Sequence, residues 1–335
     1  MNNILVNPFK KLYAKLKDLL STPKKRKYFA SKCINVFFNV VKYIFLIGIS
    51  FIVLYPLILQ LAVAFRLPTD VSNPEVMWIP EHFSIENFKI AMKALNYWEA
   101  LGTTFFNSLV ISLLQVAATA CAGYAFARLK FRGRKVLFFL SLFTIIVPQT
   151  MVSLPMYINF AKAGLLGKKY VLFLMSGLGM GIKSGIFIYL FKQSFKGLPK
   201  ELEEAAYMDG CNVFQVYIKV MFPCVRSTII TVLLLAFVWQ WNDYYYTNLF
   251  FINGATDIYT LATQLQTMST GSSLQQALLQ ANIWQMMGQD VTSNPLFVSM
   301  ILNTAGILVM LPVLIMYFFL QKLFVEGIEK SGIVG

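Results

Sequence analysis

Long apolar runs, separated by short polar and basic segments, dominate the chain. A helix that crosses a bilayer needs about 20 mostly apolar residues. Six runs of this kind cover residues 39–65, 104–128, 136–160, 170–192, 227–252 and 297–321. The pattern therefore predicts an all-α membrane protein with six transmembrane helices.

The composition agrees with a protein that has the bilayer as its main solvent. Of the 335 residues, 57% are hydrophobic and only 13% are charged, whereas about 25% of the residues in soluble domains are charged. The net charge of +14 does not indicate nucleic-acid binding, because the basic residues gather in short segments between the apolar runs, as membrane topology requires. We expect no nucleic-acid partner.

The basic residues also predict the orientation of the chain. Lysine and arginine are enriched in cytoplasmic loops, and they are frequent in residues 1–38 and in the "RLKFRGRK" that follows the second run. Both segments are therefore expected in the cytoplasm, and with six spans so is the C-terminal tail. Three lysines around residues 163–169 argue mildly against this orientation.

Residues 1–38 form a basic segment ahead of the first run. Its apolar residues recur at helical spacing, at Phe9, Leu12, Tyr13, Leu16, Leu19 and Leu20. This spacing favours a helix on the anionic inner leaflet that ends at Pro23, and a disordered basic tail is the alternative. We expect the segment to stay attached, because it lacks the short apolar core and cleavage site of a signal peptide. Residues 39–335 are expected to form the membrane domain.

Residues that carry catalysis or hold metal ions are scarce. His82 is the only histidine, and we find no paired carboxylates, nucleophile elbow or zinc motif. "GLLGKK" at Gly164 lacks the spacing and hydroxyl of a phosphate-binding loop, so another chain must bind ATP if ATP is used. The four cysteines show no metal-ligand spacing: Cys33, Cys121, Cys211 and Cys224. We predict that the chain is not an enzyme and that it holds no catalytic residue, metal, cofactor or disulfide.

Residues 199–223 stand out between the fourth and fifth runs because they are polar and helix-forming. "KELEEAAYMD" favours a helix that begins after Pro199, and Gly210 suits the left-handed turn that ends it. Asn212 suits the first cap of a second helix running to Met221. The sequence predicts a helix–turn–helix on the cytoplasmic side.

The first of these helices has features of a docking surface. Ala205 and Ala206 leave one face with little side-chain bulk, so that another protein can approach closely. The carboxylates of Glu201, Glu203 and Glu204 are expected to keep the helix soluble. Pro223 is expected to set the direction in which the chain enters the fifth span.

This stretch resembles the coupling motif of ABC importer permeases, which reads E-A-A, three residues, G, nine residues, I-x-L-P. The matching residues are Glu204, Ala205, Ala206, Gly210, Val220, Phe222 and Pro223. Val220 and Phe222 replace the isoleucine and leucine of the motif and keep the apolar bulk. An ordinary amphipathic loop helix is the alternative.

The resemblance narrows to the six-span partner of the maltose-type carbohydrate permeases, over roughly residues 40–335. It is carried by "FFNSLVIS" at Phe105, "GYAFARLKFRGRK" at Gly123, "VPQTMVSLPMY" at Val147, "WND" at Trp241 and the final Gly335. It implies a type I ABC importer permease fold in a bacterial cytoplasmic membrane, with residues 199–223 as coupling helices.

The same resemblance implies the partners. They are membrane lipid, a second homologous permease subunit, two ATP-binding subunits that hold ATP and Mg²⁺, and an extracytoplasmic binding protein that delivers an oligosaccharide. The long outer loop 253–295, free of Lys and Arg, is implied to contact the binding protein, and its "LQQALLQANIWQMM" is a candidate helix for this contact. A solvated insertion without function is the alternative.

Sugar sites combine aromatic platforms with polar side chains that exchange hydrogen bonds. The third, fourth and fifth runs supply both kinds in the candidate substrate pathway: Gln149, Tyr157, Asn159, Lys183, Trp239, Gln240, Trp241, Asn242 and Asp243. These residues cannot all face one side, so only some are expected to line the pathway. An aromatic belt at the outer interface and helix-packing contacts are the alternatives.

Lys183 lies deep in the fourth run, where a charge costs roughly 3 kcal/mol unless it faces water or a partner. It is expected either to line the pathway, which would suit an acidic sugar, or to pair with Asp243. Such a pair would also suit a secondary transporter or channel, with inverted repeats and broken helices, but no convincing repeat is seen. A scaffold that only recruits an ATPase would leave the polar residues of the spans unexplained.

Overall fold

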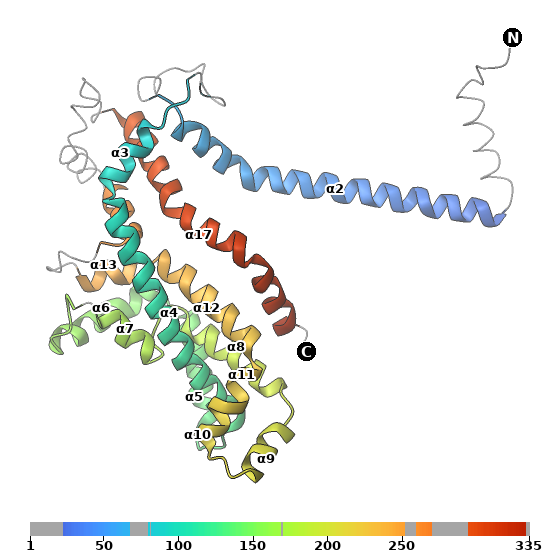
Figure 1. Cartoon of the computed structure of the whole chain (residues 1–335), viewed down its shortest axis with the longest axis vertical. Coiled ribbons are helices and arrows are strands. Elements are labelled where there is room, and N and C mark those ends of the chain that lie inside the picture. The colour runs from blue at the N-terminus through green and yellow to red at the C-terminus, as the bar shows by residue number, and fades with distance from the viewer. Residues whose placement is uncertain are drawn as a thin grey trace. The chain divides into compact units, whose positions relative to one another are not determined.

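The computed structural model describes residues 23–67, 80, 82–168, 170–251, 259–269 and 294–332. Every regular element within these ranges is a helix (Figure 1). The chain divides into two compact units, residues 1–62 and 63–335, which are described separately below. The all-α class predicted from the sequence is confirmed.

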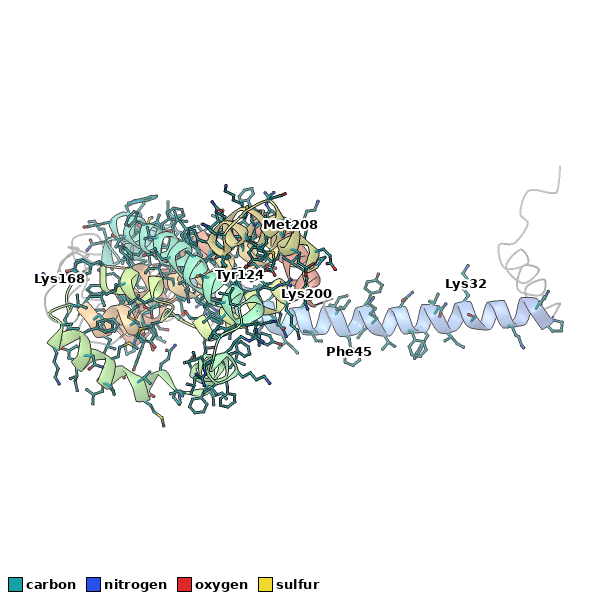
Figure 2. The ribbon with its side chains drawn as sticks, turned by 90° about the horizontal axis from the view of Figure 1, so that it is seen from below. Lys32, Phe45, Tyr124, Lys168, Lys200 and Met208 are labelled. Carbon is teal, nitrogen blue, oxygen red and sulfur yellow. The ribbon has the colours of Figure 1, made fainter. Side chains whose placement is uncertain are left out.

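The first unit consists of α2 (Pro23–Ala64) up to residue 62. Its apolar stretch is long enough to cross a membrane, and side chains such as Lys32 and Phe45 project away from the helix axis (Figure 2). The amphipathic helix predicted before Pro23 lies outside the described residues. Pro23 is the first residue of α2, a position where proline is well tolerated because no helical N–H is lost.

The second unit contains the remaining elements. They are α3 (Glu86–Ala94), α4 (Tyr97–Arg128), α5 (Arg134–Ile146), α6 (Gln149–Lys162), α7 (Tyr170–Gly177), α8 (Ser184–Gly197), α9 (Glu201–Met208), α10 (Val213–Val216), the π-helical turn η2 (Tyr217–Met221), α11 (Phe222–Cys224), α12 (Arg226–Trp241), α13 (Tyr245–Phe251), α14 (Leu261–Ser269) and α17 (Pro295–Gly332). The central helix is α4, which packs against α7, α8 and α12 (Figure 1). In turn, α17 packs against α3, α12 and α14.

A stripe of small and polar residues lets the other helices approach α4 closely. Thr104, Ser108, Ser112 and Thr119 are buried along it. At Gly123 an added Cβ would lie only 2.5 Å from the Cβ of Phe191 on α8. Small residues of this kind are typical of helix contacts inside membranes, where close backbone packing replaces the hydrophobic effect between helices.

Three apolar clusters hold the second unit together. One joins α3, the end of α12, α14 and α17. Another joins α4 and α8 to α9, α10, η2 and α12. The last joins α7 and α13 to the middle of α4. The second cluster matters most here, because it connects the polar segment between α8 and α12 to the membrane helices.

Three helices of the described residues are long and apolar enough to cross a membrane: Ile34–Ala64, Tyr97–Arg128 and Pro295–Lys322. Two bent pairs of helices meet the same criterion as units, Arg134–Ile146 with Gln149–Lys162 and Val213–Cys224 with Arg226–Trp241. The total is therefore three, or up to five if each bent pair is one span. The count of six stays a prediction.

Several of the predicted runs are broken in the structure. The run 136–160 bends by 109° between α5 and α6. Val147 and Pro148 are extended there, with ψ of 122° and 136°, because a residue before proline avoids the helical conformation. The run 170–192 breaks at residues 178–183, where the glycines at 179 and 181 interrupt the helix, and α12 ends at Trp241.

The predicted outer loop 253–295 contains a packed helix, α14. Leu261 and Met268 of this helix are buried in the cluster with α3 and α17, and the Leu261 N–H donates to the Thr104 hydroxyl at 2.8 Å. This part of the loop therefore belongs to the core. The helix predicted for "LQQALLQANIWQMM" lies outside the described residues.

Candidate functional site

The segment between α8 and α12 forms two helices joined by a tight turn, as predicted. Gly210 occupies the left-handed region with φ of +81°, and the Cys211 N–H donates to the Ala206 carbonyl at 3.0 Å. Asn212 and Gln215 form a reciprocal capping box, with both hydrogen bonds at 2.9 Å. We call residues 201–224 the α9–α11 segment.

The second helix of this segment continues beyond the predicted end at Met221. It runs through α10, η2 and α11 to Cys224, and a bend of 81° then leads into α12. Pro223 lies within α11 and not at the bend itself, which falls at Val225. Val220 and Phe222 are half-buried against the second cluster, so these two motif residues serve the packing of this chain.

Ala205 and Ala206 do not share one exposed face. Ala205 is exposed, whereas Ala206 is buried in the second cluster with only 6% of its surface accessible. The prediction that Ala206 offers a low-bulk face to another protein was wrong. Adjacent helical positions are turned by about 100° from one another, so only Ala205 faces outward.

Glu203 also departs from its predicted role as a solubilising residue. Its carboxylate lies 3.7 Å from the guanidinium of Arg128, and both side chains are largely buried. Arg128 donates two hydrogen bonds to the Phe195 carbonyl, at 3.0 and 2.7 Å, and another to the Leu198 carbonyl. Arg128 therefore ties the end of α4 to the end of α8 and to α9.

Sequence reasoning missed Arg128. The only sequence signal was its place at the end of the second apolar run, within "GYAFARLKFRGRK", where nothing distinguishes it from the neighbouring basic residues. Only the packing of α4, α8 and α9 shows that this arginine caps the carbonyls of a neighbouring helix.

The outer surface of the α9–α11 segment mixes apolar and acidic side chains. Met208 is 88% exposed, and its side chain lies at the edge of the molecule in Figure 2. The other exposed large apolar residues are Leu202, Tyr207, Val213, Phe214 and Ile218. Exposed Glu201, Glu204 and Asp209 lie among them. Because carboxylates are costly in hydrocarbon, this surface suits a protein partner better than lipid.

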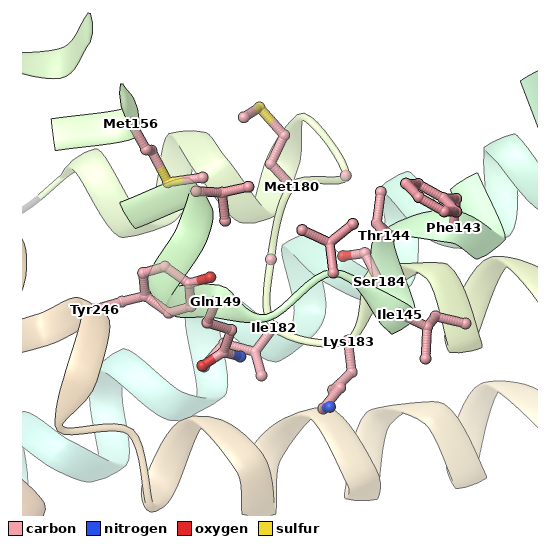
Figure 3. A pocket seen from close by; sticks show the side chains of 14 residues that line it. Phe143, Thr144, Ile145, Gln149, Met156, Met180, Ile182, Lys183, Ser184 and Tyr246 are labelled. Carbon is pink, nitrogen blue, oxygen red and sulfur yellow. The ribbon is translucent and has the colours of Figure 1, made fainter. Parts of the chain in front are cut away.

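A second feature is a cavity of about 310 Å³ beside the break between α5 and α6. The turn between α7 and α8 forms its other side. Gln149, Lys183 and Tyr246 contribute to its lining, and Figure 3 shows Gln149 and Tyr246 close to Ile182, with Lys183 pointing toward α12. Two of the predicted pathway residues, Gln149 and Lys183, are thus brought together.

Lys183 lies in an unusual backbone conformation, with φ of +59°. Its side chain is exposed, and Nζ lies 5.7 Å from the centroid of the Trp239 ring. Trp239 packs on Phe187 of α8, with ring centroids 5.7 Å apart. The predicted pathway residue Trp239 therefore contacts Lys183 but does not line the cavity.

Asp243 does not pair with Lys183. Its oxygens accept hydrogen bonds from the N–H groups of Tyr246 and Thr247, at 3.1 and 3.0 Å, and from the Thr247 hydroxyl at 2.9 Å. In the part of the chain that the structure describes, no ion pair joins the two residues. The carboxylate instead caps α13, a helix-start role typical of aspartate.

Gln115 of α4 holds the turn that carries Lys183. Its amide donates to the Ile182 carbonyl at 2.6 Å and to the Ser184 hydroxyl at 3.0 Å. An added Cβ at Gly181 would lie 2.9 Å from this amide, so the turn fits closely around it. Sequence reasoning missed Gln115, because a glutamine in an apolar run gives no sign of which loop it contacts.

The other predicted pathway residues lie elsewhere. Gln240 is buried beside Tyr246 in a small adjoining cavity. Trp241 is buried in the cluster with α17, and its indole N–H donates to the Val309 carbonyl at 3.1 Å. Asn242 is exposed and bonds the Val238 carbonyl at 2.8 Å. On α6, Tyr157 is half-buried and Asn159 exposed, and neither lines the cavity.

The cysteines and acidic residues form no cluster in the described ranges. Cys121, Cys211 and Cys224 are free thiols, and the side chain of Cys33 lies outside the description. Among the residues that were described, no group of three or more His, Cys, Asp or Glu is placed to hold a metal ion. The expected absence of a metal and of a cofactor stays a prediction.

Comparison with known families identifies the class of protein. Residues 119–330 match the family described as binding-protein-dependent transport system inner membrane component, and the chain belongs to this family. It is therefore a transport permease of the inner membrane and not an enzyme. The resemblance to ABC importer permeases drawn from the sequence is confirmed.

Individual relatives are carbohydrate permeases. The chain is 26% identical over 290 residues to the arabinooligosaccharides transport system permease protein AraQ of Halalkalibacterium halodurans, covering 86% of this chain and 93% of that protein. It is 27% identical over 294 residues to the maltodextrin transport system permease protein MdxG of Bacillus subtilis, covering 88% and 95%.

A solved structure shares the fold. It belongs to a bacterial ABC transporter involved in the import of the acidic polysaccharide alginate, and it superposes with a TM-score of 0.68 at 21% sequence identity. The likeness covers 86% of this chain and 96% of that chain. The permease fold therefore extends over most of this chain.

Proposed function

We propose that this chain forms half of the translocation pathway of an ATP-driven importer for an oligosaccharide. Its family consists of membrane components of binding-protein-dependent transport systems. Its relatives AraQ and MdxG are named as permeases for arabinooligosaccharides and for maltodextrin. The cavity at the α5–α6 break, with its amide, ammonium and aromatic groups, supplies the chemistry that sugar recognition needs.

The α9–α11 segment is the proposed coupling element, and the exposed apolar surface around Met208 and Phe214 is the observation that carries this role. Two ATP-binding subunits dock there, and they hold the ATP and Mg²⁺. The turn at Gly210 keeps the two helices in a fixed arrangement. The second cluster, which includes Ala206 and Val216, links any movement of these helices to α4, α8 and α12.

The remaining partners follow from the surfaces that the second unit leaves open. Helix α5 has no buried residue, although it is strongly apolar, and it lies next to the cavity. A second homologous permease covers this side and completes the pathway. An extracytoplasmic binding protein delivers the sugar to the pathway. Both termini of the chain lie in the cytoplasm of a bacterial cell, an orientation that the distribution of lysine and arginine favours.

A secondary transporter or channel is less well supported. Broken helices, which that function would need, do occur at α5–α6 and between α7 and α8. That function also relied on an ion pair between Lys183 and Asp243. Asp243 instead accepts hydrogen bonds from the N–H groups at the start of α13. A binding-protein-dependent family also indicates import driven by partner subunits.

Co-purification tests the coupling role. The tagged full chain, expressed with the neighbouring subunits, is expected to retain the ATP-binding subunits, and Met208→Glu is expected to weaken their retention at least about tenfold, because a buried unpaired charge costs several kcal/mol at an interface. Phe83→Glu is the matched control, since Phe83 is also an exposed apolar residue, at 75%, but precedes α3.

If Met208→Glu retained the ATP-binding subunits as well as the wild type does, the α9–α11 segment would not be part of the ATPase interface. Loss of retention in Phe83→Glu as well would show that the effect is not specific to this segment. A wild-type chain that neither retains an ATP-binding subunit nor transports any sugar would overturn the proposed function itself.

A further inference from the structure

Lys183 lines the cavity at the α5–α6 break and extends its ammonium toward α12, and we propose that this ammonium binds the carboxylate of an acidic sugar unit. This inference rests on the proposed function and names the substrate class of the same pathway. Lys183 is the recognising cation, the Trp239 ring fixes its ammonium, and Gln149 contacts the sugar hydroxyls.

The backbone at Lys183 is the first observation. A residue other than glycine rarely adopts positive φ, because its Cβ comes too close to the following carbonyl oxygen. In the described ranges only Asn96 and Lys183 do so without being glycine. Strain of this kind persists where the surroundings enforce it, and it concentrates at binding sites. Here Gln115 enforces it through its bonds to Ile182 and Ser184.

The charge of Lys183 is the second observation. In the described part of the chain no carboxylate neutralises it, and Asp243 is occupied by the start of α13. The face of Trp239 attracts the ammonium but carries no net charge that would neutralise it. A cation held in place without an anionic partner is suited to receive one from a ligand.

The rest of the cavity fits a sugar. Gln149 and the hydroxyls of Thr144 and Ser184 offer donors and acceptors along the lining, whereas Ile182 and Met156 provide apolar walls for the C–H faces of the ring (Figure 3). The volume of about 310 Å³ lies at the lower end of ordinary small-molecule sites, which range over about 300–1,000 Å³. The site therefore takes a short part of an oligosaccharide.

Binding to the full chain in lipid nanodiscs tests the inference without the partner subunits. The probes are tri-galacturonate and its methyl ester, which has the same rings and no charge, with tryptophan fluorescence as the readout. We expect the acid to bind about tenfold or more tightly than the ester, as one charge-assisted hydrogen bond predicts. Lys183→Met should remove this preference and Lys183→Arg should retain it.

Two controls separate the site from general effects. Lys162→Met removes an exposed lysine at the end of α6, outside the cavity, and should leave the preference unchanged. Trp98→Phe removes an exposed tryptophan of α4 outside the cavity and should leave the affinities and the fluorescence change unchanged.

The outcomes distinguish this inference from the proposed function. Equal affinity for acid and ester in the wild type, an unchanged preference in Lys183→Met, or competition by inorganic phosphate at the same concentration as the acid would overturn the acidic-sugar site. The importer would still stand if the assembled complex transported neutral oligosaccharides. A preserved preference in a chain that never assembles with an ATPase would instead contradict the proposed function and support the site.

Discussion

At the scale of single residues, Ala205 and Ala206 illustrate how adjacent positions divide between two tasks. Ala206 is buried among the residues that join α9 to α4 and α8, and Ala205 is exposed. The motif letters alone assign both alanines to one docking face. The structure separates internal packing from the surface that a partner can reach.

We therefore expect opposite defects from the same substitution at these positions. Ala206→Trp should overpack the second cluster and lower the free energy of unfolding by about 1–3 kcal/mol, seen as a lower melting temperature of the purified chain. Ala205→Trp should leave the melting temperature unchanged but reduce ATPase retention, because the added ring lies on the outer surface. If both variants melted like the wild type, Ala206 would not be a packing residue.

At the scale of elements, Arg128 joins three helices that are distant in sequence. It ends α4, binds the last carbonyls of α8 and contacts Glu203 of α9. The same pair of helices is linked again near the cavity, where Gln115 of α4 bonds Ile182 and Ser184 at the start of α8. Helices α4 and α8 therefore form a rigid connection between the α9–α11 segment and the Lys183 turn.

Arg128→Met should weaken this connection at the end that meets α9. The change leaves Glu203 and the Phe195 carbonyl without their partner, and breaking a buried pair in this way typically costs about 3–5 kcal/mol. We expect a lower melting temperature and a loss of sugar-stimulated ATP hydrolysis. In the double variant Arg128→Met with Glu203→Gln, part of the stability should return, since no unpaired charge remains. Additive losses would mean that the two residues act independently.

At the scale of the whole molecule, the orientation in the membrane links the two candidate sites to their partners. The basic segments predict that the α9–α11 segment lies in the cytoplasm and the loop 253–295 outside. With the native cysteines replaced by serine, a label that cannot cross the membrane should react with Met208→Cys only from the cytoplasmic side. The same label should react with Ser272→Cys only from the outside.

Met208 suits this labelling because it is 88% exposed, whereas Asn212 caps a helix and should be left intact. If both positions were labelled from the same side, an even number of spans would have to lie between them, and not the single span that is predicted. If Met208→Cys reacted only from the outside and Ser272→Cys only from the cytoplasm, the predicted orientation would be reversed. The α9–α11 segment could then not contact a cytoplasmic ATPase.

The class of the protein and the local form of the α9–α11 segment were both predictable from the amino-acid sequence. Apolar runs of bilayer length define a membrane protein whatever the packing, and the turn at Gly210 and the cap at Asn212 depend on neighbours within a few residues. The spacing of these residues was therefore enough to predict both features and the transporter family.

Only the tertiary structure decided which side chains meet. The break at Val147 and Pro148, the burial of Ala206, the Arg128–Glu203 contact and the capping role of Asp243 depend on how distant helices pack, and apolar runs do not encode their own neighbours. The cavity around Lys183 likewise arises where two broken helices meet, with Gln115 supplied by a third. Side chains that look equivalent along the fifth run differ in the same way, because Trp239 contacts Lys183 whereas Trp241 is buried against α17.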